Sequence, residues 1–297
     1  MDSTPSRPIL DLFSLKGQNA LITGASRGIG AACALALAQA GADLCLILRP
    51  PVDPQLTPEI VNTIRTACPN ARVEVVHADL SDTASVKRVF PLALEKMNGE
   101  IDIFVNCAGI QRRAPAELFS EDDWDEFFPT LALRWRVLTT NLKSAFLLSQ
   151  AAGAHMLSRP ANPPHAADSN SNAPTGSKTS VKSIIHFASL LSFQGGLTVP
   201  AYAAAKGGIA QLVKALSNEW SGKGVRVNAV VPGYVRTDMN SALLANPTRL
   251  RQISERIPAG RWGDPADFAG VVVFLASRAS LYVCGELVVV DGGWMGR

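Results

Sequence analysis

Short apolar runs alternate with segments of helical periodicity along most of the chain. The predicted strands cover 19–25, 43–48, 72–80 and 102–109, followed by 183–189, 226–233 and 286–293. The predicted helices between the first four strands cover 28–42, 58–69 and 82–99. Near-continuous apolar strands that alternate with helices are typical of a parallel sheet covered on both faces. The pattern therefore predicts an α/β fold with a doubly wound, seven-stranded parallel sheet.

Two segments break this alternation. The first runs from Trp124 to Ser144, where Pro129 and the sequence "LALRWR" interrupt an amphipathic helical pattern. The second, 158–182, is rich in Pro, Ser, Asn and Ala without periodicity, which predicts a mobile surface loop. We expect a flexible tail over 1–11 and one domain over 12–297.

Composition narrows the class of protein. Of the 297 residues 47% are hydrophobic, and the net charge is only +3. The absence of a long Lys/Arg run disfavours nucleic acid or an anionic membrane as a partner. The five cysteines are scattered, without metal-ligand or disulfide spacing, and the apolar runs are too short to span a bilayer. We expect a cytoplasmic enzyme without a metal.

A glycine-rich turn follows the first predicted strand. Gly24, Gly28 and Gly30 in "TGASRGIG" (23–30) let the backbone approach a pyrophosphate closely, and the helix that follows offers free N–H groups. Glycines at such a turn can also serve the turn alone. Their position between a buried strand and an Ala-rich helix favours a dinucleotide site.

The end of the second strand bears on which dinucleotide binds. NAD sites usually place an Asp or Glu there, whereas this chain has Leu48 and Arg49. Arg27 of the glycine turn is expected nearby, and two guanidinium groups suit a 2′-phosphate. The alternative is that one or both point into water. We favour NADP(H) over NAD(H), with Asp79 placed to meet the adenine amino group.

A tyrosine and a lysine four residues apart supply candidate chemistry. In "YAAAK" Tyr202 and Lys206 share one helix face. A neighbouring ammonium lowers the pKa of a phenol, which can then exchange a proton with a carbonyl oxygen or an alcohol. Ser189, at the end of the predicted strand 183–189, is positioned to bind the same oxygen. Taken alone, the Tyr–Lys pair fits any surface helix.

Five motifs in this order resemble the short-chain dehydrogenase/reductase family: "TGASRGIG", "NCAG" (106–109), Ser189, "YAAAK" and "PGYVRTD" (232–238). The resemblance covers about 12–297 and implies a Rossmann-type domain, an NAD(P)(H) cofactor and a homotetramer or homodimer. It implies that Tyr202 is the acid–base, that Ser189 polarises the substrate carbonyl and that Lys206 binds the nicotinamide ribose. It implies that Asn141 holds a relay water. Cys107 departs from the family, which more often has Asn there.

The expected cofactor contacts combine the motif residues and the strand ends. They are Gly24, Ser26, Arg27, Gly28, Ile29, Gly30, Arg49, Asp79, Leu80, Asn106, Ala108, Gly109, Tyr202, Lys206, Pro232, Gly233, Val235 and Thr237.

A finer resemblance is carried by "AGIQRRAPAELFSEDDWDE", "ASLLSFQGGLTVPAYAAAKGG", "RIPAGRWGDPADFAG" and "VVVDGGW". Together these segments resemble the branch that acts on 2-deoxy-D-gluconate and 2-dehydro-3-deoxy-D-gluconate. It implies a small sugar-acid substrate. Arg112 and Arg113, just after the fourth strand, are candidates for binding its carboxylate, with ordinary surface or interface roles as the alternative. Gln194 and Trp262 are candidates for a polar and a stacking contact with the sugar chain. Ser189 and Tyr202 complete the expected substrate site.

Two other functions remain open at this stage. One is a 3-oxoacyl thioester reductase of the same fold, with a wider apolar cleft. The other is a catalytically weak dinucleotide-binding or assembly module. The interrupted helix around Asn141 favours the second alternative, and the intact Ser189, Tyr202 and Lys206 disfavour it.

The interruption itself has a definite size. Trp124 and Asn141 are seventeen residues apart, against about seven in the family, and removal of Phe127–Arg136 restores a family-like helix. Ten residues do not complete whole helical turns, and Pro129 disfavours a continuous helix. We expect 127–136 to be extruded, with Asn141 in its relay position. The alternative is that these residues do not belong to the natural mature protein.

Overall fold

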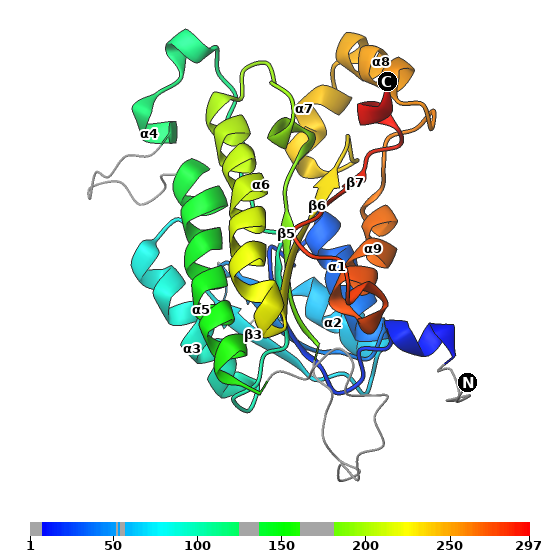
Figure 1. The fold of residues 1–297 in the computed structure, drawn as a ribbon. Helices are drawn as coiled ribbons and strands as arrows, with labels where there is room; N and C mark the ends of the chain where they lie inside the picture. Colours follow the sequence, from blue (N-terminus) through cyan, green and yellow to red (C-terminus); the bar gives the residue numbers. More distant parts are fainter. Residues whose placement is uncertain (1–7, 52, 54–56, 125–136, 161–180) are drawn as a thin grey trace.

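A computed structural model describes residues 8–51, 53, 57–124, 137–160 and 181–297 of the chain. Seven strands form one parallel sheet in the order β3-β2-β1-β4-β5-β6-β7. Figure 1 shows this sheet among its helices. They are β1 (Asn19–Thr23), β2 (Asp43–Leu48), β3 (Val73–His77), β4 (Ile103–Asn106), β5 (Lys182–Phe187), β6 (Val225–Pro232) and β7 (Leu287–Val290). The strand order reverses between β1 and β4, and ligands of open α/β sheets bind at such a switch point.

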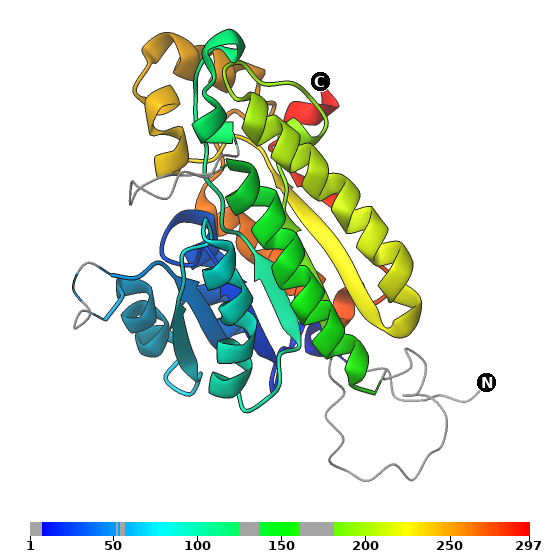
Figure 2. The same ribbon diagram turned by 90° about the vertical axis from the view of Figure 1, so that its left-hand side faces the viewer.

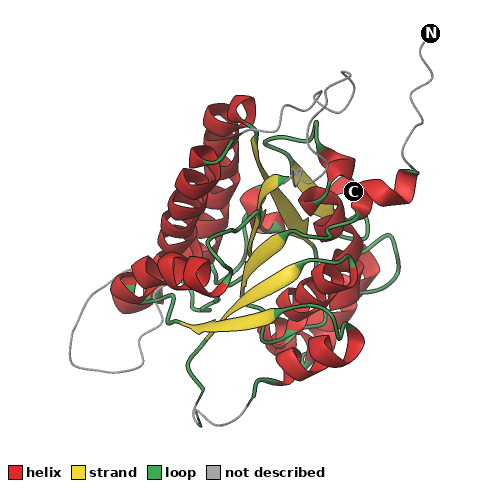
Figure 3. Cartoon of the chain, turned by 90° about the horizontal axis from the view of Figure 1, so that it is seen from below, coloured by secondary structure: helices red, strands yellow, loops and turns green. Residues whose placement is uncertain are grey.

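Helices cover both faces of the sheet (Figure 3). One face carries α1 (Gly28–Gln39), α2 (Glu59–Ala67) and α9 (Ala269–Ala276), and the other carries α3 (Thr83–Lys96), α5 (Ser144–Ser158) and α6 (Pro200–Trp220). Successive residues of β1 pack alternately into the hydrophobic cores on the two faces of the sheet. Leu21 packs with α3, α5 and α6, whereas Ala20 and Ile22 pack with the other layer. The predicted fold class is confirmed.

Short elements lie beyond the carboxyl ends of the strands. There α4 (Glu121–Trp124), α7 (Ser241–Leu244) and α8 (Pro247–Arg256) gather at the upper end of the molecule in Figures 1 and 2. The 3₁₀ turns are η1 (Ile9–Phe13), η2 (Ala116–Leu118), η4 (Leu190–Ser192), η5 (Ser221–Lys223), η6 (Asp238–Asn240), η7 (Pro265–Phe268), η8 (Arg278–Ser280) and η9 (Trp294–Gly296). A π-helical turn, η3 (Thr139–Lys143), leads into α5. Of these elements, η3, η4, η6, η7, α7 and α8 contribute residues to the lining of a cleft above the sheet.

Several strands end earlier than the sequence pattern predicts. The first strand stops at Thr23 because Gly24 adopts φ +72°, a left-handed conformation that turns the chain out of the sheet. At the N-terminus η1 crosses the predicted boundary between tail and domain, and Phe13 lies 6.4 Å from Phe274, ring to ring. The predicted extrusion of 127–136 and most of the predicted loop 158–182 lie outside the described residues.

Candidate active site

A cleft of about 1740 Å³ runs along the carboxyl ends of the strands. Most of the predicted site residues line it: Gly24, Ser26, Arg27, Gly28, Ile29, Gly30, Arg49, Asp79, Leu80, Ala108, Gly109, Arg112, Arg113, Ser189, Gln194, Tyr202, Lys206, Pro232, Gly233, Val235 and Thr237. Asn106, Asn141 and Trp262 lie outside this lining. The cleft therefore collects residues from both halves of the sequence, as expected at a switch point.

The glycine turn packs its backbone tightly at one end of the cleft. A Cβ on Gly24 would lie 2.7 Å from the amide nitrogen of Ala108, and a Cβ on Gly30 would collide with the carbonyl of Gly24. Helix α1 begins at Gly28, and its preceding residue, Arg27, provides no side-chain cap. The first-turn N–H groups and the positive end of the helix dipole are thus left for an anion. These features fit a nicotinamide dinucleotide.

Basic side chains dominate the charge of the cleft. Its described basic residues are Arg27, Arg49, Arg112, Arg113, Lys206, Arg236 and Arg249, against the acidic Asp79 and Asp238. Partial burial lowers the pKa of Arg49, and the neighbouring Asp79 opposes this shift. Arg27 pairs with Asp238 at 2.8 Å across the mouth of the cleft, with both side chains more than 70% exposed. This excess of positive charge suits an anionic cofactor and an acidic substrate.

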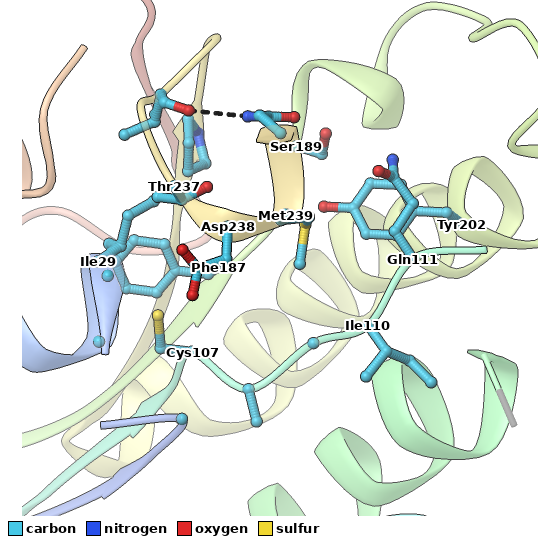
Figure 4. A pocket seen from close by; sticks show the side chains of 18 of the residues that line it. Ile29, Cys107, Ile110, Gln111, Phe187, Ser189, Tyr202, Thr237, Asp238 and Met239 are labelled. Carbon is cyan, nitrogen blue, oxygen red and sulfur yellow. Dashed lines mark hydrogen bonds between the residues drawn. The ribbon is translucent and has the colours of Figure 1, made fainter. Parts of the chain in front are cut away.

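Ser189, Tyr202 and Lys206 meet in the middle of the cleft. Ser189 follows β5, while Tyr202 and Lys206 lie on α6, which starts with Pro200 at its first position. In Figure 4 the Tyr202 hydroxyl points into the cleft, on the side where Ser189 lies. Lys206 Nζ lies 5.6 Å from the Tyr202 ring centre and donates a 2.5 Å hydrogen bond to the Phe187 carbonyl.

Burial governs the ionisation of this cluster. It raises the pKa of Tyr202 to about 12, and a hydrogen bond with Ser189 opposes that shift. It also lowers the pKa of Lys206 to about 8. The sequence predicted a Tyr202 pKa lowered by Lys206. In the folded chain desolvation outweighs such an effect, because it disfavours the charged form of both groups.

Asn141 lies within the π-helical turn η3 and is buried. Its side-chain oxygen accepts from the Ile110 amide at 2.9 Å, and its side-chain nitrogen donates to the Ile110 carbonyl at 2.8 Å. A Cβ built on Gly109 would lie 3.5 Å from Asn141 Oδ1 and 3.8 Å from Lys206 Nζ, so the two side chains face the same small region. Both polar atoms of the Asn141 side chain thus bond to the Ile110 backbone.

The substrate end of the cleft contains the residues after β4. Arg112 forms an ion pair with Asp123 of α4 at 3.5 Å, whereas Arg113 donates to the Gln111 side chain at 3.0 Å. Gln194 accepts from the Trp294 indole at 3.4 Å. Tyr234 lines this end and packs between two tryptophan rings, with centroids 5.4 Å from Trp262 and 4.7 Å from Trp294.

Two family models match the chain in succession. The short chain dehydrogenase model matches residues 18–163, and a model described as Enoyl-(Acyl carrier protein) reductase matches residues 170–295. A 2-dehydro-3-deoxy-D-gluconate 5-dehydrogenase from Pseudoalteromonas atlantica is 43% identical, over 97% of this chain and 100% of the relative. This chain belongs to the short-chain dehydrogenase/reductase family. The recognition made from the motifs is confirmed.

Solved structures agree with the assignment. An Agrobacterium tumefaciens protein with bound NADP is 40% identical to this short-chain dehydrogenase, with a TM-score of 0.79 over 97% of this chain and 100% of that one. A gluconate 5-dehydrogenase from Burkholderia cenocepacia, solved with NADP and tartrate, is 33% identical. Its TM-score is 0.79, over 98% of this chain and 100% of that one. The dehydrogenase thus belongs to a group whose members bind nicotinamide cofactors.

Trp262 of the dehydrogenase does not reach the cleft. It is 1% exposed, and its indole nitrogen donates to Ser254 of α8 at 3.0 Å. The prediction that Trp262 stacks against the sugar chain is therefore wrong, because its buried ring packs against Tyr234 and does not line the cleft. Tyr234, within the "PGYVRTD" motif, is the aromatic residue of this pair that lines the cleft, and no motif role had been predicted for it.

Asn106 also faces away from the cleft, into a buried chain of hydrogen bonds. Its Oδ1 accepts from Thr23 at 3.1 Å, and Thr23 accepts from the Ala108 amide at 3.1 Å. Its Nδ2 lies 3.4 Å from His186 Nδ1, and His186 Nε2 lies 3.1 Å from Ser149 Oγ. Because Ser149 donates to a backbone carbonyl, the network assigns the proton of His186 to Nε2. Asn106 thus supports the Ala108 loop of the dehydrogenase from below.

Proposed function

We propose that this dehydrogenase interconverts the ketone and the secondary alcohol of a sugar acid, with NADP(H) as the preferred cofactor. The observation that carries the proposal is the cluster of Ser189, Tyr202 and Lys206 inside a strongly basic cleft. Relatives that cover 97% and 95% of the chain are named 2-dehydro-3-deoxy-D-gluconate 5-dehydrogenase and Gluconate 5-dehydrogenase.

Each residue of the cluster has a distinct role in the proposal. The bound nicotinamide supplies or accepts the hydride. In the reductive direction Tyr202 donates its proton to the substrate oxygen, and burial keeps the phenol protonated for this step. Ser189 donates a hydrogen bond to the same oxygen. Lys206 binds the nicotinamide ribose, and its ammonium stabilises the phenolate that remains.

Asn141 has a supporting role. Its side chain fixes the Ile110 backbone, and its region of η3 lies beside Lys206. We propose that a water on the Asn141 carbonyl returns a proton to Tyr202 through Lys206. Single π-turns occur frequently at functional sites, which supports this reading.

The preference for NADP(H) rests on the adenosine end of the cleft. Arg49 lines it where an NAD site usually has a carboxylate, and Arg27 lies at the glycine turn. Two relatives have been solved with NADP. We propose that Arg49 and Arg27 bind the 2′-phosphate, with Arg27 exchanging its Asp238 partner for the phosphate.

We further propose a homo-oligomer built on the outer face of α5 and α6. An apolar groove of about 580 Å³ lies there, lined by Leu138, Leu142, Phe146 and Leu212 among others. Phe146 is 40% exposed, which favours a protein partner over solvent. We propose the cytoplasm as location, in line with the free state of the described cysteines. Within the described ranges, no helix combines the length and hydrophobicity of a membrane span.

A cofactor-resolved activity screen tests the proposal. Purified protein is given NADPH or NADH with keto-gluconates, a 3-oxoacyl thioester and simple diketones. We expect fastest turnover of a keto-gluconate with NADPH. The model that matches residues 170–295 is described as Enoyl-(Acyl carrier protein) reductase, and this is the reason to include an acyl thioester as the second candidate. Cofactor binding without turnover of any carbonyl compound would favour a binding module instead.

A further inference from the structure

Helix α8 presents two different faces. Ile253 is buried and Arg256 stacks over the Trp294 ring at 3.9 Å, so the face that they share points into the protein. Arg249 precedes Ile253 by four residues and Arg256 by seven, which places it on that same face. Arg251 lies about half a turn away, on a face where it pairs with Glu255 at 3.9 Å and is 73% exposed.

Arg249 is held in place at the rim of the cleft. Asn246 caps the start of α8 by accepting from the Arg249 amide at 3.0 Å, and the Arg249 guanidinium donates to Gln252 at 3.0 Å. Trp262 anchors the far end of α8 through Ser254. The Arg249 side chain is half-buried and lines the cleft.

Arg113, which follows β4, lines the same cleft as Arg249. Partial burial lowers the pKa of Arg113, and the charge of Arg249 lowers it further, while Tyr234 and Tyr202 oppose both. Arg113 therefore lies within electrostatic reach of Arg249, of the aromatic wall and of the acid–base tyrosine. Two guanidinium groups facing one cleft repel each other unless an anion lies between them.

The partners of these two arginines are neutral. Arg113 donates to Gln111 and Arg249 donates to Gln252, and no described carboxylate pairs with either side chain. Arg112 is different, because Asp123 neutralises it. Of the two arginines after β4, Arg113 is thus the one whose charge is available to a ligand.

We propose that Arg249 and Arg113 together bind the carboxylate of the substrate, opposite Tyr202, and that Arg249 determines the preference for acidic over neutral ketones. This rests on the proposed sugar-acid function. Guanidinium groups bind carboxylates through paired, charge-assisted hydrogen bonds. Tyr234, fixed between Trp262 and Trp294, forms the wall along which the sugar chain extends to the acid–base residue.

The test compares a keto-gluconate with its uncharged primary amide in wild type, Arg249→Gln and Arg251→Gln. We expect Arg249→Gln to lower the kcat/KM ratio of acid to amide by about 10- to 100-fold, the range for a hydrogen bond to a charged group. Most of the change should appear in KM. Arg249→Lys should keep part of the ratio. Arg251→Gln, two residues away on the exposed face, should leave the ratio within about twofold of wild type.

A binding measurement separates this proposal from the proposed function. Calorimetry with tartrate and NADP should show an at least tenfold weaker tartrate Kd in Arg249→Gln than in Arg251→Gln. Wild type that binds tartrate through Arg249 yet reduces no keto acid would refute the proposed function and retain the carboxylate site. Equal losses for acid and amide, or tartrate binding that does not change in Arg249→Gln or is absent from wild type, would overturn the carboxylate site.

Discussion

Two regions of the cleft are built by different physical means. At the glycine turn the backbone shapes the site, because Gly24 and Gly30 allow close approach and α1 offers uncapped N–H groups. In the middle of the cleft buried side chains shape the site, and burial shifts the pKa of Tyr202 and Lys206 in opposite directions. The first region is sensitive to volume and the second to charge.

This difference teaches where each kind of substitution acts. An added methyl group at the glycine turn meets backbone, which cannot move aside cheaply. Replacing Tyr202 by phenylalanine keeps the ring and removes only its hydroxyl group. Substitutions in the two regions therefore test this contrast between volume and charge, and each experiment includes a control.

The largest effect is expected for Tyr202→Phe. The ring remains in its buried position, but the proton donor is lost, so kcat/KM should fall by about 10²–10⁴-fold. The Kd for NADPH, measured by fluorescence titration, should change little because the glycine turn is intact. Tyr282→Phe, at a fully exposed position, serves as control. If the variant retained a tenth or more of the wild-type kcat/KM, Tyr202 would not be the acid–base residue.

Gly30→Ala probes the backbone end. Its Cβ would collide with the Gly24 carbonyl, and such overpacking costs about 1–3 kcal/mol. We expect the Kd for NADPH to rise by about 10- to 100-fold. Gly270→Ala is the matched control, since its Cβ meets open space in α9 and a helical alanine is favoured by up to about 1 kcal/mol. Equal cofactor affinity in both variants would contradict the steric account.

The buried network beneath the catalytic end should respond to pH. Burial lowers the pKa of His186 to about 3, while a histidine in the unfolded chain titrates near pH 6.5. Between these values the unfolded chain binds more protons. The stability that neutral His186 contributes is therefore complete above about pH 6.5 and is lost as the pH falls towards 3.

His186→Asn should flatten this acid dependence. The slope from one such group is at most about 1.4 kcal/mol per pH unit. Urea unfolding of wild type and variant at pH 6.5, 5.5 and 4.5 measures the difference in slopes, since other titrating groups are shared. Parallel slopes would show that His186 does not stay neutral in the folded chain.

The smallest effect is expected at Arg49. This side chain is only partly buried, so its contact with a 2′-phosphate is screened by solvent. Arg49→Leu should raise the KM for NADPH by about tenfold and leave the KM for NADH nearly unchanged. Steady-state kinetics with both cofactors provides its own control. An equal rise in the KM for NADH would show that Arg49 attracts both cofactors by its charge and does not bind the 2′-phosphate specifically.

The order of strands and helices was predictable because the apolar runs are long and regularly spaced. The catalytic candidates were predictable because Ser189, Tyr202 and Lys206 belong to short motifs of fixed spacing. Trp262 was misplaced since sequence does not tell which of two nearby aromatic residues, Tyr234 or Trp262, faces the cleft.

Long-range partners could not be read from the sequence. Arg27 and Asp238 are 211 residues apart, and only the folded cleft mouth brings them together. Arg249 lies in a polar helix without a motif, and its orientation follows from the burial of Ile253 and the stacking of Arg256. His186 looked like an ordinary strand residue until its two ring nitrogens were seen bonded to β4 and α5.

The hydrogen-bond chain through Thr23, Asn106 and His186 has a consequence for the motions of the cleft. Its outermost donor is the amide of Ala108, which belongs to a loop but is bonded to a fully buried hydroxyl. Amides exchange with solvent only when such a bond opens, and here opening would disturb three strands and α5 together. In deuterated water the Ala108 amide should therefore exchange as slowly as the centre of the sheet, although Ala108 lines the cleft.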